Sequence, residues 1–157
     1  MPVQQIRPTV DRDALLPGAD FVDAYAIGIG SRPLDARSAA VQMIEHGPNW
    51  IGTLMRVRNL VVAPFGLKRP ASDRPDRGDS IGIFPVLGET PQRIVAGFDD
   101  HHLDFRVVID VEGDPAPRRV VASTLVRTNN RLGRTYLATI MPFHRLVVRA
   151  MLRQLAD

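Results

Sequence analysis

Residues 103–128 read LDFRVVIDVEGDPAPRRVVASTLVRT, and this stretch decides the fold. Two runs rich in β-branched residues, 103–111 and 119–128, flank the turn-forming sequence EGDPAPR. Such a short connection between strand-like runs favours an antiparallel hairpin. Along the first run, Leu103, Phe105, Val107 and Ile109 share one face, which predicts the side of the sheet that meets the core.

The same pattern extends outward on both sides of this hairpin. Strands are predicted for DFVDAYAI at 20–27, IGIFPVL at 81–87 and RIVAGF at 93–98, because each is bounded by Gly or Pro. Helices are predicted from the N-cap Asp35 to His46 and from Pro48 to Pro64. Residues 132–155 form the longest helical pattern. Its apolar stripe, at steps of three and four, is predicted to consist of Leu132, Tyr136, Ile140, Phe143, Val147, Met151 and Leu155.

This order of elements predicts an α+β fold of the helix-grip kind. An antiparallel sheet curves around a long C-terminal helix, with two shorter helices between the first strand and the second. Imperfect closure leaves a cavity between sheet and helix, where apolar ligands usually bind. We expect a single domain over residues 1–157, with a flexible N-terminus at 1–15 and a mobile loop at 64–80. That loop is either a lid over a pocket or a solvated connection.

Composition excludes several classes of protein. The chain has no cysteine, which rules out disulfide scaffolds, thiolate nucleophiles and cysteine-ligated zinc. No apolar run is long enough for membrane insertion, and the N-terminus lacks a secretory signal pattern, so a cytoplasmic location is the default expectation. The net charge of +3 comes almost entirely from arginine and has no continuous basic stripe, so no nucleic-acid partner is predicted.

Three segments resemble a bacterial family known as domain of unknown function 2867. They are WIGTLMRVRNLVVAPFGLK at 50–68, HHLDFRVVIDV at 101–111 and TLVRTNNRLGRTYLATIMPFHRLVVRAML at 124–152. LDFR, NRLGRTY and PFHRLVVRAML are the most specific pieces. The resemblance implies membership of the START-like (SRPBCC) helix-grip superfamily and therefore a ligand cavity. Some relatives carry a dinucleotide-binding domain, but G-I-G at 28–30 lacks a third glycine, so no cofactor is predicted.

Histidines and charged residues on the strands supply the candidate chemistry. His144, close to Pro142, is either a general acid or base or a buried structural histidine. Asp104 and Arg106 share one strand face, which predicts an ion pair there or a solvated outer face. Adjacent His101 and His102 point to opposite faces of a strand. A metal site would need His102, Asp104 and His144 together, and none is predicted.

Our first functional hypothesis is a non-catalytic module that binds an apolar or amphipathic small molecule between the sheet and the long helix. Polar groups at Arg127, Tyr136 and His144 would orient the ligand. The expected apolar walls are Trp50, Phe84, Phe98, Phe105 and Leu125.

Two alternatives remain open. In the first, an enzyme uses the same cavity for hydrolysis, cyclisation or isomerisation, with His144 and either Asp104 or Arg127 as acid and base groups. In the second, an interaction protein has a filled core and no ligand. A homodimer is compatible with each hypothesis.

Overall fold

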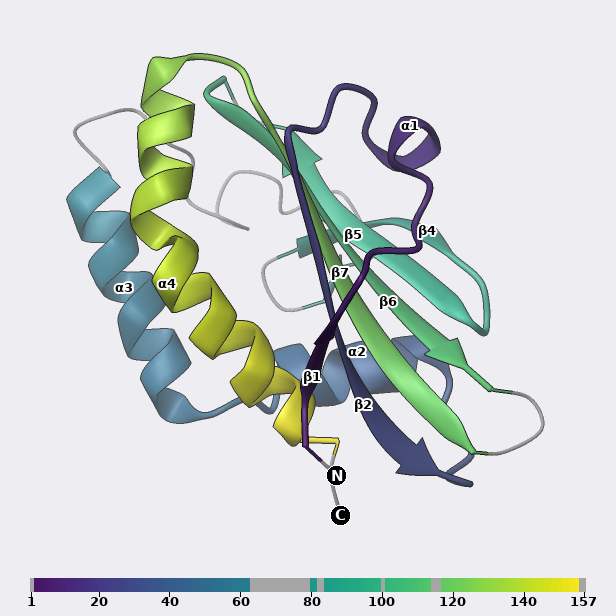
Figure 1. Cartoon of the computed structure of the whole chain (residues 1–157). Coiled ribbons are helices and arrows are strands. Elements are labelled where there is room, and N and C mark those ends of the chain that lie inside the picture. The colour runs from purple at the N-terminus through teal and green to yellow at the C-terminus, as the bar shows by residue number, and fades with distance from the viewer. Residues whose placement is uncertain (1, 63–79, 82–83, 100, 114–116, 156–157) are drawn as a thin grey trace.

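The computed structural model describes residues 2–62, 80–81, 84–99, 101–113 and 117–155. Its centre is a seven-stranded sheet in the order β1-β2-β7-β6-β5-β4-β3, in which all neighbours are antiparallel (Figure 1). The strands are β1 (Gln4–Ile6), β2 (Phe21–Gly30), β3 (Ser80–Ile81), β4 (Phe84–Glu89), β5 (Arg93–Asp99), β6 (Leu103–Glu112) and β7 (Arg118–Thr128). The predicted α+β fold, with a curved antiparallel sheet and a C-terminal helix, is confirmed.

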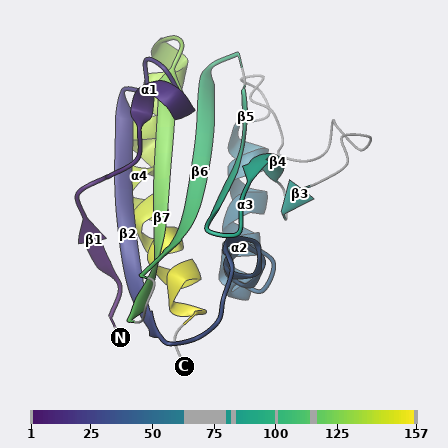
Figure 2. The ribbon, with the colours of Figure 1, turned by 90° about the vertical axis from the view of Figure 1, so that its right-hand side faces the viewer.

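Three helices lie on one side of the sheet, and a short one lies on the other (Figures 1 and 2). The longest, α4 (Arg131–Arg153), crosses β2 and β7, while α2 (Ala36–Ile44) packs against β5 and β6. Helix α3 (Asn49–Val62) lies on the same side of the sheet as α4, and α1 (Arg12–Leu15) lies on the opposite side. We call the two sides of the sheet the helix-facing side and the outer side.

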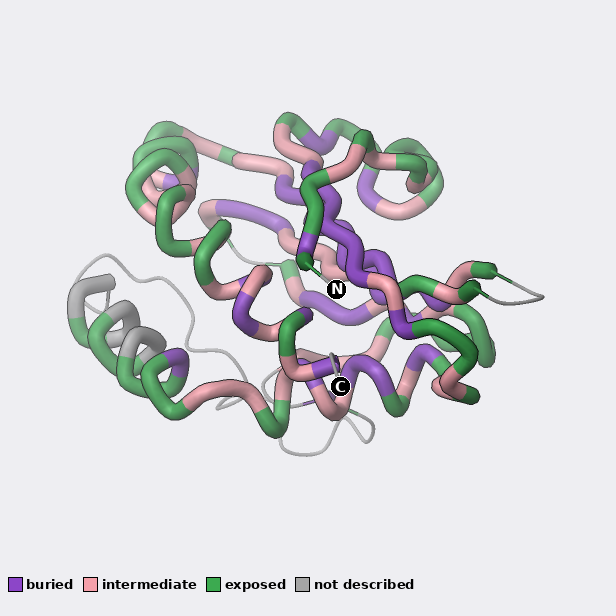
Figure 3. The backbone as a smooth tube through the Cα atoms, turned by 60° about the horizontal axis from the view of Figure 1, so that its bottom comes forward, coloured by how far each residue is buried: buried purple, intermediate pink, exposed green. Residues whose placement is uncertain are grey.

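The main core lies between the helix-facing side and helices α2 and α4. Tyr25, Ile27, Ile109 and Val120 pack there with Met43 and other helix residues, and the strand tubes are buried through this region (Figure 3). Burial of these side chains is the main favourable contribution to the free energy of folding.

A second apolar layer covers the outer side. Leu16 and Ala19, on the segment that leads from α1 into β2, pack against Val108 and Leu125. Both faces of β6 and β7 are therefore buried near their centres, which explains why VVASTLV in β7 is apolar on both faces.

Helix α4 begins at an N-cap, because the Asn130 side chain accepts a hydrogen bond from Gly133 N. Gly133 lies so close to the segment just before β6 that a Cβ atom there would be 2.1 Å from the carbonyl oxygen of His102. The buried residues of α4 include Gly133, Val148 and Leu152, and Phe143 is 49% exposed. The buried stripe is thus rotated from the predicted one, which included Phe143.

Two segments are predicted to be flexible, residues 1–15 and residues 64–80. Residues 1–15 contain β1 and α1, and β1 pairs with β2. Of the predicted loop at 64–80, residues 64–79 lie outside the described residues, and Ser80 begins β3.

Close approach of β5 and β6 depends on Gly97, so replacing it should destabilise the fold. Gly97 has φ +153°, and a Cβ there would be 2.1 Å from the carbonyl oxygen of Phe105. We expect Gly97→Ala to lower the free energy of unfolding by about 3 kcal/mol, measured by urea denaturation. Gly88→Ala is the matched control, because no atom lies within 4 Å of a Cβ at Gly88. Equal unfolding midpoints for the two variants would contradict this explanation.

Candidate functional site

The helix-facing side of the sheet has two halves that differ in the burial of their side chains. One half is sealed, and the other is partly open. In the sealed half, residues Ile27, Ile94, Ile109, Val111 and Val120 are almost fully buried under α2 and α4. In the other half, Phe98, Phe105 and Val107 remain only half-buried, although they lie on the central strands β5 and β6. Helix-facing side chains in the middle of a sheet are normally sealed, so this half is the candidate site.

Three phenylalanines form one edge of the candidate site. We call Phe84, Phe98 and Phe105 the aromatic row. The ring centroids of Phe84 and Phe105 are 5.5 Å apart, and those of Phe98 and Phe105 are 5.8 Å apart. Centroids at these distances are in the range for attractive ring contacts, so the row is a continuous apolar surface.

Smaller residues lie at the next level along the strands. Strand register aligns Asp23 with Thr124, Thr124 with Val107, and Val107 with Ala96. We call Thr124, Val107 and Ala96 the floor. Because neighbouring strands are about 4.8 Å apart, the floor spans about 10 Å beside the aromatic row.

An acidic residue and a histidine meet at the β2 end of the floor. His144 Nε2 lies 3.1 Å from Asp23 Oδ2 and 3.5 Å from Oδ1. Both side chains are largely buried, and the Phe21 ring contacts the His144 ring in an edge arrangement with centroids 6.1 Å apart. When Nε2–H donates to Asp23, the other ring nitrogen of His144, Nδ1, is left for a second hydrogen bond.

Tyr25 follows Asp23 on the same side of β2 and is fully buried. Its hydroxyl group has no hydrogen-bond partner among the described residues. The Arg149 guanidinium lies over its ring, 5.3 Å from the centroid, which is within range of a cation–π contact. A buried hydroxyl without a partner costs free energy, so it marks a place where a ligand's polar group could bind.

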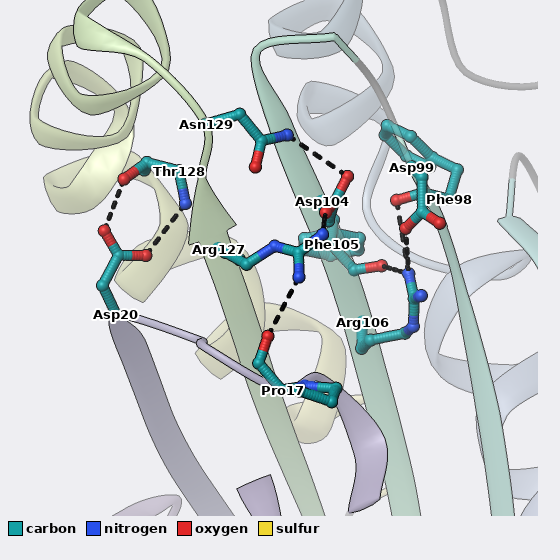
Figure 4. Close-up of polar contacts among 10 residues, drawn as sticks. All are labelled: Pro17, Asp20, Phe98, Asp99, Asp104, Phe105, Arg106, Arg127, Thr128 and Asn129. Carbon is teal, nitrogen blue, oxygen red and sulfur yellow. Dashed lines mark hydrogen bonds and ion pairs between the residues drawn. The ribbon is translucent and has the colours of Figure 1, made fainter. Parts of the chain in front are cut away.

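The outer side carries a separate network of charged residues (Figure 4). Arg127 donates hydrogen bonds to the Asp104 carboxylate and to the carbonyl oxygen of Pro17. Arg106 forms an ion pair with Asp99, at 2.8 Å between Nη1 and Oδ1. The predicted pairing of Asp104 with Arg106 is therefore wrong. Asp104 is only 3% exposed and is neutralised across the strands by Arg127, so it does not lie on a solvated face.

Asp20, next to this network, links the start of β2 to the end of β7 through hydrogen bonds. Thr128 donates to the Asp20 carboxylate through both its backbone N–H and its hydroxyl group. Burial opposes ionisation of Asp20, but these hydrogen bonds outweigh it and lower the pKa of the carboxyl group below its ordinary value.

His102 contacts the residues at the N-terminus of α4. Its backbone carbonyl accepts from Asn129 N at 2.9 Å, and its ring Nδ1 lies 2.9 Å from Asn130 Nδ2. Within the described part of the chain, no three His, Asp or Glu side chains lie close enough to hold a metal ion. His102 thus fixes the N-cap residue of the helix that carries His144.

Comparison with protein families assigns the chain. The family model described as "Protein of unknown function (DUF2867)" matches residues 15–151. The chain belongs to this family. No curated protein and no solved structure matches this DUF2867 chain. Among its described helices, none has the length and apolar character needed to cross a bilayer.

Four predicted site residues of the DUF2867 chain lie on the same side of the sheet. Phe84, Phe98, Phe105 and His144 all belong to the helix-facing side. Tyr136 is half-buried on the N-terminal half of α4.

Three predicted residues lie elsewhere. Arg127 and Leu125 point to the outer side, because they alternate with Thr124 and Val126, and Leu125 packs against Leu16 there. Their predicted place in the cavity is therefore wrong. Trp50 lies on α3 and is 46% exposed.

Sequence reasoning missed Asp23, Tyr25 and Thr124 as site residues. Residue parity gives a signal for the first two, since Asp23 alternates in phase with Phe21, Tyr25 and Ile27. A carboxylate on the apolar face of a strand is costly to bury unless it is paired. A residue of the element packed on that face is therefore expected to bind it.

Asp104 and Arg127 should make coupled contributions to the free energy of unfolding of the DUF2867 chain. Arg127→Met leaves the buried carboxylate without its cation and should lower the free energy of unfolding by about 2 kcal/mol, since Arg127 itself is partly open to water. Asp104→Leu combined with Arg127→Met should recover most of that loss. A double-mutant cycle by urea denaturation measures the coupling, and strictly additive effects would exclude it.

Proposed function

We propose that this DUF2867 chain is a START-like, helix-grip module that binds an apolar or amphipathic small molecule between the sheet and α4. The observation that carries the proposal is the half-buried aromatic row together with Val107, on strands β4 to β6, next to a sealed core on the same side of the sheet. A packed core without a ligand would bury these side chains as deeply as Ile94 and Ile109.

The polar groups at the β2 end of the floor would contact the end of the ligand that lies away from the aromatic row. Asp23, His144 and the Tyr25 hydroxyl group come from β2 and α4, and they can accept or donate hydrogen bonds in a largely apolar surrounding. A ligand with one hydrogen-bonding end and a flat apolar body matches this arrangement, because its body can stack along the aromatic row.

The test begins with mass spectrometry of the purified chain, native and then denatured, to detect a small molecule released on unfolding. Val107→Trp fills the floor and should abolish both this species and binding of the fluorescent probe 1-anilinonaphthalene-8-sulfonate. Val95→Trp is the matched control, since Val95 is also a half-buried strand valine but belongs to the cluster on the outer side. Circular dichroism verifies that both variants fold.

Two results would count against the binding proposal. Equal probe binding by the Val107→Trp variant and the unmodified chain would place the site elsewhere. No released species together with no probe binding would favour a filled core, the structure expected of an interaction protein.

A second candidate function, proton-transfer catalysis at the same site, is favoured by the Asp23–His144 pair. A carboxylate that holds one imidazole nitrogen orients the ring and leaves the other nitrogen to take a proton from a substrate. The carboxylate is Asp23, and neither Asp104 nor Arg127 is within reach of this role, because both lie on the outer side.

Deuterium exchange separates catalysis from binding. If His144 transfers protons, the recovered ligand should gain deuterium at carbon when incubated with the chain in D₂O. His144→Gln should still bind the ligand but lower the exchange rate by about 100-fold or more. Exchange that is unchanged in the His144→Gln variant would leave binding as the function.

A further inference from the structure

Helices α3 and α4 share a charge pattern that the proposed ligand site does not explain. Neither helix contains an aspartate or a glutamate. The described exposed arginines on the two helices are Arg56, Arg131, Arg134, Arg145 and Arg153. Between α2 and the end of α3 the only acidic residue is Glu45, at the C-cap of α2. The charge on these two helices is therefore of one sign.

The same two helices carry most of the exposed large hydrophobic side chains of the described residues. Among the described residues, the exposed large hydrophobic side chains are Leu87 on β4 and five on the helices, namely Trp50, Val57, Leu60, Phe143 and Leu146. Leu60 is 76% exposed. Single exposed apolar residues are ordinary, but their concentration on two helices of the same side of the sheet indicates an interaction surface.

The two helices lie on one side of the molecule. Figures 1 and 2 show both helices on the helix-facing side of the sheet, away from α1. On α3, Trp50, Val57 and Leu60 lie on one helical face, because their spacings of seven and three residues return to the same side of a helix. On α4, Phe143 and Leu146 are three residues apart and flank Arg145. Each helix therefore exposes both apolar and cationic side chains.

We infer that α3 and α4 form a docking surface for an anionic phospholipid bilayer, with the chain bound peripherally. Arginine side chains attract phosphate headgroups, and neighbouring apolar side chains enter the boundary between headgroups and acyl chains. Nucleic acid fits less well, because three of the five exposed apolar residues are aliphatic and cannot stack on bases. The inference does not depend on the proposed ligand site.

Trp50 supplies a direct readout, since it is the only tryptophan of the chain and lies within the surface. We expect its fluorescence emission to shift to shorter wavelength when the full chain is titrated with vesicles of phosphatidylcholine mixed with phosphatidylglycerol. Vesicles of phosphatidylcholine alone should give little shift, and added salt should weaken binding. Cosedimentation with the vesicles gives an independent binding constant.

Matched variants test whether this surface is the one that binds. Arg145→Glu combined with Arg153→Glu should weaken partitioning onto anionic vesicles at least about tenfold. Leu60→Ser and Leu146→Ser should each weaken it several-fold, because less apolar surface enters the bilayer. The controls are Arg7→Glu and Leu87→Ser, exposed residues outside both helices, which should bind as the unmodified chain does. Circular dichroism again verifies folding.

Four results would overturn the inference. The first is no binding to anionic vesicles, and the second is equal weakening by Arg7→Glu and the helix variants. The third is a Trp50 shift that follows protein concentration without lipid, which would make the surface a contact between two copies. The fourth is binding of duplex DNA or RNA that is lost in the Arg145→Glu, Arg153→Glu variant while vesicles leave Trp50 unchanged.

Discussion

The unbroken register between β6 and β7 is the constraint on which the rest of the structure depends. Pairing runs without a bulge from Leu103 opposite Thr128 to Glu112 opposite Arg119. Because side chains alternate along a strand, a slip by one residue would exchange the two sides of the sheet. This register puts Phe105, Val107 and Thr124 under the helices and puts the Asp104–Arg127 pair beneath the N-terminal segment. The same strand register therefore positions the residues of both the proposed ligand site and the outer network.

Long periodic segments of the fold could be predicted from the sequence, and short ones could not. The strands expected at 93–98, 103–111 and 119–128 agree with β5, β6 and β7 within one residue at each end. β1 and β3 have three and two residues, too few to show an alternation. Their positions depend on pairing with β2 and β4, which is tertiary information.

The candidate site was only partly predictable for a related reason. His144 could be singled out as a titratable residue beside a helical proline, but its partner Asp23 is far away in sequence and is brought to it by the packing of α4 on β2. Leu125 and Arg127 were assigned to the wrong side because β7 is apolar on both faces. Alternation reveals two faces but cannot say which one meets the helix when the other is also covered.

The strand order has a consequence for synthesis of the chain on the ribosome. β2 is made early, yet its pairing partner over most of its length, from Phe21 opposite Val126 onward, is β7. β5, β6 and β7 can pair as they emerge, because each follows its neighbour closely in sequence. β2 remains with an unpaired edge until β7 is complete, and during that interval its apolar residues are exposed to chaperones or to other nascent chains.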